Sequence, residues 1–495
     1  MPSLTLSKST YIRGLQCEKS LFLHKKHGDL RNPISESQQA IFDQGTSVGE
    51  LAQQLFPGGV DCSPEDYSKF NQSFEDTKKH IAQGTPVIYE AAFKYDGVMV
   101  FADILVNDRD GWKVYEVKSS TSVKPTYVKD AALQTYVINK SGITLKDTFV
   151  VHINNQYVRN GELDIERLFT KVSIREELDE LLQEIPTNIS KLKETLKQDD
   201  IPEREIGPHC SDPYDCDFSG VCWKDVPDQS VFDVRGLRTN RKFQLHEEGV
   251  ERLVDIPDDF RLSDKQRMQV IGAQTGESSI DKPQIKKFVD SLNYPLYYLD
   301  FETINPAIPL FDYSRPYEQL PFQYSVHIQE YEGAECIHNE YLAETDGTDP
   351  RIKFIQQLIK DCGTKGDVVV YNKGFEKGKL AALGNAFSHY AKSLDAIKER
   401  VVDLMIPFQK GWYYTPEMQG SYSIKLVLPA LVPELSYSDM EIGDGGAASS
   451  IFASMAAGNF DGDHDKTRND LLEYCKLDTW AMVKILDKLN ETINR

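Results

Sequence analysis

Hydrophobic and polar positions follow two different periods along the chain, which predicts a mixture of strands and helices. In the first half, runs rich in β-branched and aromatic residues predict strands at 87–93, 98–106 and 112–118, with a turn at 107–111. Apolar positions at helical spacing predict the helices of this half, at 7–27, 39–55, 127–140 and 174–198.

The second half shows the same mixture after a stretch of shorter helical patterns. The predicted strands are 297–303, 322–330, 335–344 and 368–372. The predicted helices are 243–253, 263–274, 349–361 and one that includes 472–478. Together the two halves indicate an α/β fold class.

Two acidic residues stand at alternate positions in the predicted strand 297–303. Because side chains alternate across a strand, Asp300 and Glu302 point to the same face. Two carboxylates on one face repel each other unless a cation lies between them, and hard divalent cations such as Mg²⁺ take oxygen ligands. The alternative is a pair of solvent-facing acids on an edge strand.

Further acidic residues follow this pair at the ends of predicted elements. Asn372 ends a buried strand, and Glu376 lies where the next helix opens. Asp403 follows two valines. Tyr474 and Asp478 are four residues apart on the C-terminal helix, so they share one helix face.

This order of motifs over residues 291–495 resembles the DnaQ-like 3′→5′ exonucleases of the DEDD group, which have an RNase H-like fold. The resemblance implies that Asp300, Glu302 and Asp478 bind two divalent metal ions, Mg²⁺ or Mn²⁺. It implies that Tyr474 orients the attacking water. A metal pair about 3.5–4 Å apart activates the water and neutralises the leaving oxygen of a phosphodiester.

The second motif departs from the family pattern, because it ends in Glu376 where the family usually has aspartate. Asp403 is the alternative for this acid. Asn372 and Phe375 match the family's N-x-x-F-D pattern, which favours Glu376.

The first half contains a second candidate centre. Asp103 interrupts an apolar strand, and a buried carboxylate without a partner is costly. Glu116 and Lys118 alternate on a nearby strand and so face the same way. A metal shared by Asp103 and Glu116 satisfies both acids, with Lys118 near the scissile phosphate or the water.

This D…E-x-K pattern, with Gln134 on the following helix, resembles the RecB/AddB-type branch of the PD-(D/E)XK nucleases, which includes iron–sulfur members. The branch usually has a metal-binding histidine on an upstream helix, and Gly49 stands at that position here. Three alternatives follow: Glu50 is the substitute ligand, Glu90 is the substitute ligand, or the site is weakened.

Three clustered cysteines, Cys210, Cys216 and Cys222, follow this half at equal spacing, and Cys17 lies near the N-terminus. One cysteine near the N-terminus and three after the nuclease core resemble the iron–sulfur staple of that nuclease branch, in which the cluster joins the two ends of the domain. Thiolates suit a [4Fe-4S] cluster or zinc, and plain thiols are the third alternative.

Composition limits the function classes. The chain has 495 residues, which indicates two or three domains. The sequence shows no long apolar run or secretory signal, so we expect a cytoplasmic protein without a membrane partner. The net charge of -21 argues mildly against nucleic acid, although a lysine-rich run at 113–146 offers either a local basic surface or a solvated face.

The complete arrangement resembles a bacterial family that fuses an iron–sulfur RecB/AddB-type nuclease domain to a DnaQ-like exonuclease domain. We expect a PD-(D/E)XK restriction-endonuclease-like domain at 1–225, a helical linker at 226–290 and an RNase H-like domain at 291–495. The expected function is metal-dependent hydrolysis of DNA at two centres. A nucleic-acid-binding scaffold with degenerate sites and an exonuclease acting on RNA are the alternatives.

Overall fold

The computed structural model describes residues 5–66, 69–437 and 440–494, and it divides into two compact units of mixed α/β structure. The first unit comprises residues 1–225 and 306–317, and the second comprises 226–305 and 318–495. Within the described residues, no helix combines the length and the apolar character needed to cross a bilayer.

The first unit is built on one seven-stranded sheet in the order β2-β3-β4-β5-β6-β7, with β1 paired to β4. The strands β3, β4 and β5 form an antiparallel meander, and β5 and β6 are parallel across the crossover helix α5. The strands are β1 (Leu6–Ser7), β2 (Val60–Asp61), β3 (Val87–Tyr95), β4 (Val98–Asp108), β5 (Gly111–Lys118), β6 (Leu145–Ile153) and β7 (Phe169–Ser173).

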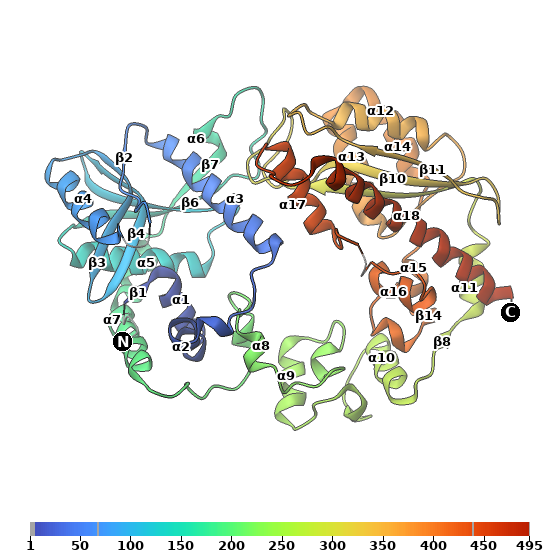
Figure 1. Ribbon diagram of the computed structural model, residues 1–495, viewed down its shortest axis with the longest axis horizontal. Helices are drawn as coiled ribbons and strands as arrows, with labels where there is room; N and C mark the ends of the chain where they lie inside the picture. Colours follow the sequence, from blue (N-terminus) through green and yellow to red (C-terminus); the bar gives the residue numbers. More distant parts are fainter. Residues whose placement is uncertain (1–4, 67–68, 438–439, 495) are drawn as a thin grey trace. The chain divides into compact units, whose positions relative to one another are not determined.

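Helices cover this sheet and bury its apolar side chains. One cluster joins the sheet to α1, α5 and α7, and a second joins it to α3. The helices are α1 (Lys8–Gln16), α2 (Glu18–Lys26), α3 (Glu36–Ala52), α4 (Phe70–Ala82), α5 (Pro125–Lys140), α6 (Ile165–Leu168), α7 (Arg175–Lys197) and α8 (Ser219–Cys222). Figure 1 shows them in blue to green.

The predicted helix at 7–27 is wrong as a single element. Cys17 has an extended backbone (φ −157°, ψ 115°), so it ends α1 and begins α2. The break changes the direction of the chain at the cysteine itself.

The second unit has a five-stranded sheet in the order β11-β10-β9-β12-β13. The central strand β9 is antiparallel to β10 and parallel to β12. The strands are β9 (Leu296–Ile304), β10 (Leu320–Gln329), β11 (Ile337–Leu342), β12 (Asp367–Val370) and β13 (Val401–Asp403).

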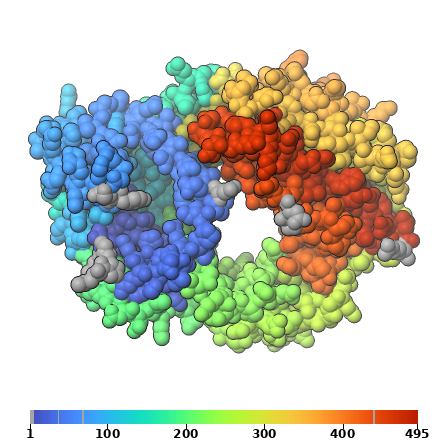
Figure 2. Space-filling model, viewed as in Figure 1, coloured from blue at the N-terminus to red at the C-terminus, as the bar shows by residue number. Residues whose placement is uncertain are grey.

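Both faces of this sheet are covered, as Figure 1 shows. Tyr297, Leu299 and Phe301 of β9 pack with α12 (Arg351–Asp361), α13 (Lys373–Ala386) and α14 (Ala391–Glu399). The opposite face of β9 lies against α17 (Gly445–Ala456) and α18 (His464–Asn494). In Figure 2 the side chains of α17 and α18 appear in red along the second unit. Alternation along β9 therefore directs Asp300 and Glu302 toward α18.

The segment predicted as a linker at 226–290 is part of the second unit. It has its own apolar cluster, which includes Val231, Leu245 and Val270. The expected helix at 243–253 is shorter, because Gly249 has a positive φ of 81° and the chain turns there. The remaining elements are α9 (Thr239–Glu247), α10 (Asp264–Thr275), β8 (Ser279–Ile280), α11 (Lys282–Val289), α15 (Ile406–Gln409), β14 (Tyr413–Tyr414) and α16 (Ile424–Leu431).

The segment 306–317 was expected in the second domain, but the structure places it in the first unit. Arg159 Nη1 donates hydrogen bonds to the carbonyl oxygens of Pro309 (3.0 Å) and Leu310 (2.7 Å). The hydroxyl groups of Ser119 and Tyr317 lie 2.9 Å apart. These side-chain contacts hold the segment against the first unit.

Candidate functional site

Three acids of the second unit meet in one place. Oxygen atoms of Asp300, Glu302 and Asp478 all lie within 4.8 Å of one another, a spacing that a shared cation can bridge. Asp300 and Glu302 come from β9, whereas Asp478 comes from α18, which packs on that face of the strand. The sequence-based expectation that these three belong to one site agrees with this geometry.

A pocket opens over the three acids and includes Glu376 on the first turn of α13. Glu376 is 1% exposed as a residue, and its Oε2 has no hydrogen-bond partner within the described chain. A buried carboxylate oxygen without a partner is costly, and a cation or its water satisfies it. The pocket is lined by Asp300, Phe301, Glu302, Tyr371, Asn372, Phe375, Glu376, Ile424, Lys425, Tyr474, Asp478 and Met482.

Asp403, the alternative second-motif acid, has a different environment. Its carboxylate accepts hydrogen bonds from the backbone N–H groups of Asn372 (3.1 Å), Lys373 (3.1 Å) and Met405 (3.0 Å). These bonds stabilise the turn between β12 and α13, where Asn372 has a positive φ of 89°. Asp403 is thus satisfied by backbone, whereas Glu376 lies in the pocket.

The electrostatics of the pocket favour a positive ion. Burial, followed by the charges of Asp478 and Glu302, raises the pKa of Asp300 well above its usual range. Burial and the charge of Asp478 raise the pKa of Glu302 to about 8. Burial also raises the pKa of Glu376 to about 8 and that of Asp478 to about 6. Burial is the largest cause of all four pKa shifts, and the charges of neighbouring acids add to it for Asp300 and Glu302; bound divalent cations would stabilise the ionised carboxylates.

Two tyrosines and a lysine complete the surroundings of Asp478. The Tyr437 hydroxyl donates a 2.6 Å hydrogen bond to Asp478 Oδ1, and Tyr474 lies in the pocket lining. The Lys425 ammonium lies 5.6 Å from the ring centres of both tyrosines and donates to the Gly443 carbonyl (2.7 Å). Sequence reasoning missed Tyr437, because no local motif marks it.

The candidate centre of the first unit is also assembled, but by more residues than the motif named. Gln134 Nε2 donates to Glu116 Oε2 (2.6 Å), and Lys118 donates to Glu116 Oε1 (2.7 Å). Lys8 donates to both oxygens of Glu116 at 2.9 Å. Although burial opposes the shift, Lys118 and Lys8 lower the pKa of Glu116 below its usual range. Sequence reasoning missed Lys8.

Asp103 lies at the edge of this group, and its Oδ2 accepts a 2.6 Å hydrogen bond from the Val117 N–H. Burial and the charge of Glu116 raise the pKa of Asp103 to about 7. Asp130, also missed, accepts a 2.5 Å hydrogen bond from Lys118. Of the two alternatives for the missing histidine, Glu90 belongs to the group. Burial and the charge of Asp103 raise the pKa of Glu90 to about 8.

Glu50, the other alternative and an expected metal ligand, is exposed on α3. The buried face of α3 at this turn is formed by Val48 and Ala52, four residues apart, so Glu50 points away from the core. The prediction that Glu50 joins the centre is therefore not supported, whereas the charges of Asp103 and Glu116 do act on the other alternative, Glu90.

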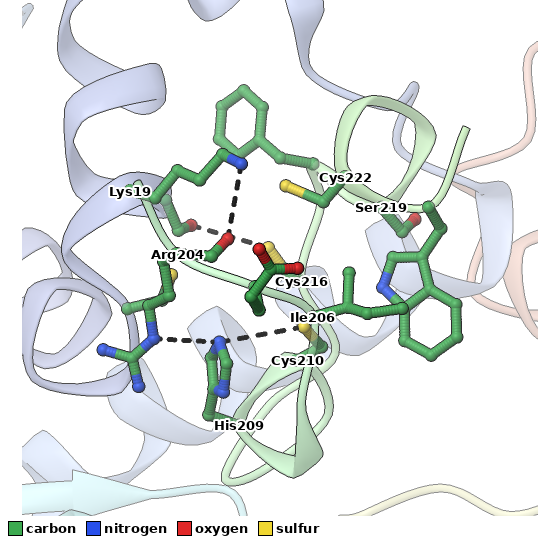
Figure 3. Close-up of a pocket in the computed structure, with 13 residues that line it drawn as sticks. Lys19, Arg204, Ile206, His209, Cys210, Cys216, Ser219 and Cys222 are labelled. Carbon is green, nitrogen blue, oxygen red and sulfur yellow. Dashed lines mark hydrogen bonds between the residues drawn. The ribbon is translucent and has the colours of Figure 1, made fainter. Parts of the chain in front are cut away.

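All four cysteines of the predicted staple line a single pocket, shown in Figure 3. They are free thiols, and Cys17 reaches the pocket from the break between α1 and α2. Burial raises the pKa of Cys222, although the ammonium group of Lys19 opposes the shift. Thiols are the donor type of iron–sulfur clusters and of zinc sites. Among the described residues, however, the four thiols are not gathered within 4.8 Å of one another as the acids of the second unit are.

Polar contacts join α1 to the cysteine segment independently of any cofactor. Gln16 Nε2 donates to the carbonyl oxygens of His209 (2.8 Å) and Tyr214 (2.6 Å). Arg13 forms two hydrogen bonds with the carboxylate of Asp217, at 2.5 and 2.9 Å. The pocket walls are thus held in place on both sides of the thiols.

Taken together, these features define a mixed α/β protein with an acidic pocket in one unit and a cysteine pocket in the other. Residues 297–423 match a family described as a domain of unknown function (DUF2779). This match includes Asp300, Glu302 and Glu376 but ends before Tyr474 and Asp478.

The chain is similar to three curated mycoplasma-group proteins. They are the uncharacterized protein UU173 of Ureaplasma parvum serovar 3 (27% identity over 211 residues), the MG366 homolog of Mycoplasma pneumoniae (26% over 205) and MG366 of Mycoplasma genitalium (24% over 219). The aligned parts cover 38%, 38% and 40% of this chain. They cover only 30%, 31% and 32% of these relatives, so the chain spans about a third of their length.

Proposed function

We propose that the second unit is a metal-dependent exonuclease that hydrolyses phosphodiester bonds from the 3′ end of a nucleic acid strand. The observation that carries this proposal is the gathering of Asp300, Glu302 and Asp478 within 4.8 Å, beneath a pocket that also contains Glu376. Bound divalent cations would activate a water molecule and neutralise charge on the leaving oxygen. DNA is the proposed substrate, and RNA is the alternative.

The chain's own residues divide the remaining work. Asp300, Glu302 and Asp478 would hold the cations, and Glu376 would hold one through its unpaired oxygen. Tyr474, on the same helix as Asp478, would orient the attacking water through its hydroxyl. Lys425 brings positive charge to the pocket lining and so favours the approach of a phosphate.

We also propose that the first unit has the PD-(D/E)XK-like arrangement and holds an iron–sulfur cluster, with zinc as the alternative. The group of Asp103, Glu90, Glu116, Lys118 and Gln134 supports a second nuclease centre. The pocket formed by the four cysteines supports the cluster. Gln134 is fully buried, and its Oε1 has no hydrogen-bond partner among the residues described, which fits a site that takes a cation or its water.

Cleavage of end-labelled substrates tests the exonuclease. Single- and double-stranded DNA and RNA are incubated with Mg²⁺ or Mn²⁺ and with protein purified without oxygen. Wild type is compared with Asp300→Asn and with Asp487→Asn, a matched control on the partly exposed surface of α18. A ladder from the 3′ end that only Asp300→Asn abolishes supports the proposal. If wild type and both variants bind the nucleic acids but none of them cleaves, the result supports the scaffold alternative instead.

A further inference from the structure

The ammonium group of Lys8 lies where a cation shared by the first-unit acids would bind. Lys8 Nζ is 2.9 Å from both oxygens of Glu116 and 3.9 Å from Asp103 Oδ1. The carboxylate of Glu116 is almost completely buried, with 2% of its side chain exposed. A divalent cation bridging Glu116 and Asp103 would need the same oxygens.

The backbone of Lys8 is held rigidly at this place. Leu6 and Ser7 pair in register with Val98 and Met99 of β4, the strand that carries Asp103. Ser7 then caps α1 through a reciprocal capping box with Thr10. Lys8 is the first residue of α1, so the fold fixes its Cα beside the acids.

The side chain of Lys8, in contrast, is the more exposed partner in this ion pair. It is 20% exposed, whereas that of Glu116 is 2% exposed. A lysine side chain has four rotatable bonds and keeps its charge hydrated at a surface. Glu116 would retain hydrogen bonds from Lys118 and Gln134 after such a movement.

A second observation indicates that the group is built to hold a cation. Gln134 is fully buried and donates to Glu116, but its Oε1 has no hydrogen-bond partner among the residues described. The acids also outnumber the ammonium groups. Lys8 and Lys118 supply the positive charges that act on Asp103, Glu116 and Asp130, and Lys8 also acts on Glu90.

We infer that Lys8 is a built-in competitor for the divalent cation of the first-unit centre. Its ammonium group holds the shared position between Glu116 and Asp103, and the cation binds only when this side chain moves out. The inference rests on the proposed metal chemistry of this centre. It makes Lys8 a regulatory residue that sets the metal affinity, distinct from the motif lysine Lys118.

Mn²⁺ binding to the full-length protein tests this inference separately from cleavage. Asp300→Asn and Asp478→Asn are introduced together to weaken the second-unit site, and free Mn²⁺ is counted by electron paramagnetic resonance. In this background, Lys8→Met should tighten Mn²⁺ binding by about tenfold or more, because the competing ammonium is gone. Lys8→Arg keeps a positive charge and should not tighten it.

Two further variants show where the ion binds. Glu116→Gln added to Lys8→Met should abolish the gained affinity, which places the ion at this centre. Lys193→Met is the matched control. Lys193 pairs with Asp96 on the surface of the same unit (2.6 Å), and its substitution removes the same charge as Lys8→Met. Thermal unfolding of each variant identifies any that fail to fold, and Lys8→Gln then replaces Lys8→Met.

Two results would overturn the inference, and they differ in what else they remove. If Mn²⁺ binds with the same Glu116-dependent affinity whether residue 8 is lysine or methionine, competition by Lys8 is rejected. The proposed metal centre of the first unit is then retained. Absence of Mn²⁺ binding in both forms would reject the metal centre of the first unit and the role of Lys8 with it.

Discussion

The hydroxyl group of Tyr437 donates a 2.6 Å hydrogen bond to Oδ1 of Asp478, across a sequence separation of 41 residues. Asp478 is one of the three acids that share the pocket of the second unit. A hydrogen bond to a ligand carboxylate orients it, and its loss typically weakens metal binding by about 10–100-fold. Tyr437 is therefore a positioning residue for the proposed metal site.

Tyr437→Phe should raise the Mn²⁺ concentration needed for half-maximal exonuclease activity by about tenfold or more, with activity restored at saturating Mn²⁺. Tyr474→Phe is the matched comparison, since it also removes one hydroxyl near Asp478. If Tyr474 orients the attacking water, that variant should lose kcat by about a hundredfold even at saturating metal. Identical behaviour of the two variants would contradict the division of roles.

Glu376 and Asp403 should separate activity from stability. Glu376→Gln should abolish most exonuclease activity, because it removes the carboxylate that would hold a cation, while leaving the thermal midpoint nearly unchanged, because the Oε2 that it replaces makes no hydrogen bond within the described chain. Asp403→Ala should cost about 1–3 kcal/mol of unfolding free energy, because three backbone N–H groups lose their acceptor. Chemical denaturation and a cleavage assay measure both effects. If Asp403→Ala instead abolished the activity and Glu376→Gln lowered only the stability, Asp403 would be the second-motif acid.

Stability of the metal-free protein should fall as pH rises. In the unfolded chain, glutamates ionise near about pH 4.3. In the folded protein the pKa values of Glu302 and Glu376 are both about 8. The folded state therefore binds more protons than the unfolded state between these values, so the free energy of unfolding decreases through this window.

The thermal midpoint of the second unit in a chelator should accordingly drop by roughly 5 °C or more between pH 5.5 and pH 8.5. Glu302→Gln should flatten this dependence, because the substituted side chain does not titrate. Added Mg²⁺ should flatten it as well, since the ion compensates the charges. A midpoint that rises with pH in the chelator would argue against buried, uncompensated acids.

Cysteine substitution should report on the first unit. Cys216→Ser should remove most of the iron, or zinc, from protein purified without oxygen and lower the thermal midpoint, because the proposed cofactor would lose one of the four cysteines that would hold it. Cys62→Ser is the matched control, since Cys62 is a buried thiol outside that pocket. Metal analysis and visible absorption measure the outcome. Equal metal content in both variants would reject the cysteine site.

Local sequence patterns were sufficient to predict most strands and to single out the motif residues of each candidate centre. Alternation in 297–303 placed Asp300 and Glu302 on one strand face, and helical spacing placed Tyr474 and Asp478 on one helix face. The period and spacing of side chains depend on a few neighbouring residues, so they can be read from the sequence without knowledge of the fold. The meander of β3, β4 and β5 was predictable for the same reason.

Only the tertiary structure decided which distant side chains complete the sites. Lys8 reaches Glu116 because β1 pairs with β4, and Tyr437 bonds to Asp478 across 41 residues of sequence. The sequence pattern already favoured Glu376 over Asp403, and the tertiary structure adds that backbone N–H groups occupy the carboxylate of Asp403. Such contacts join residues far apart in the chain. They arise from strand pairing and packing of whole elements, which no local period encodes.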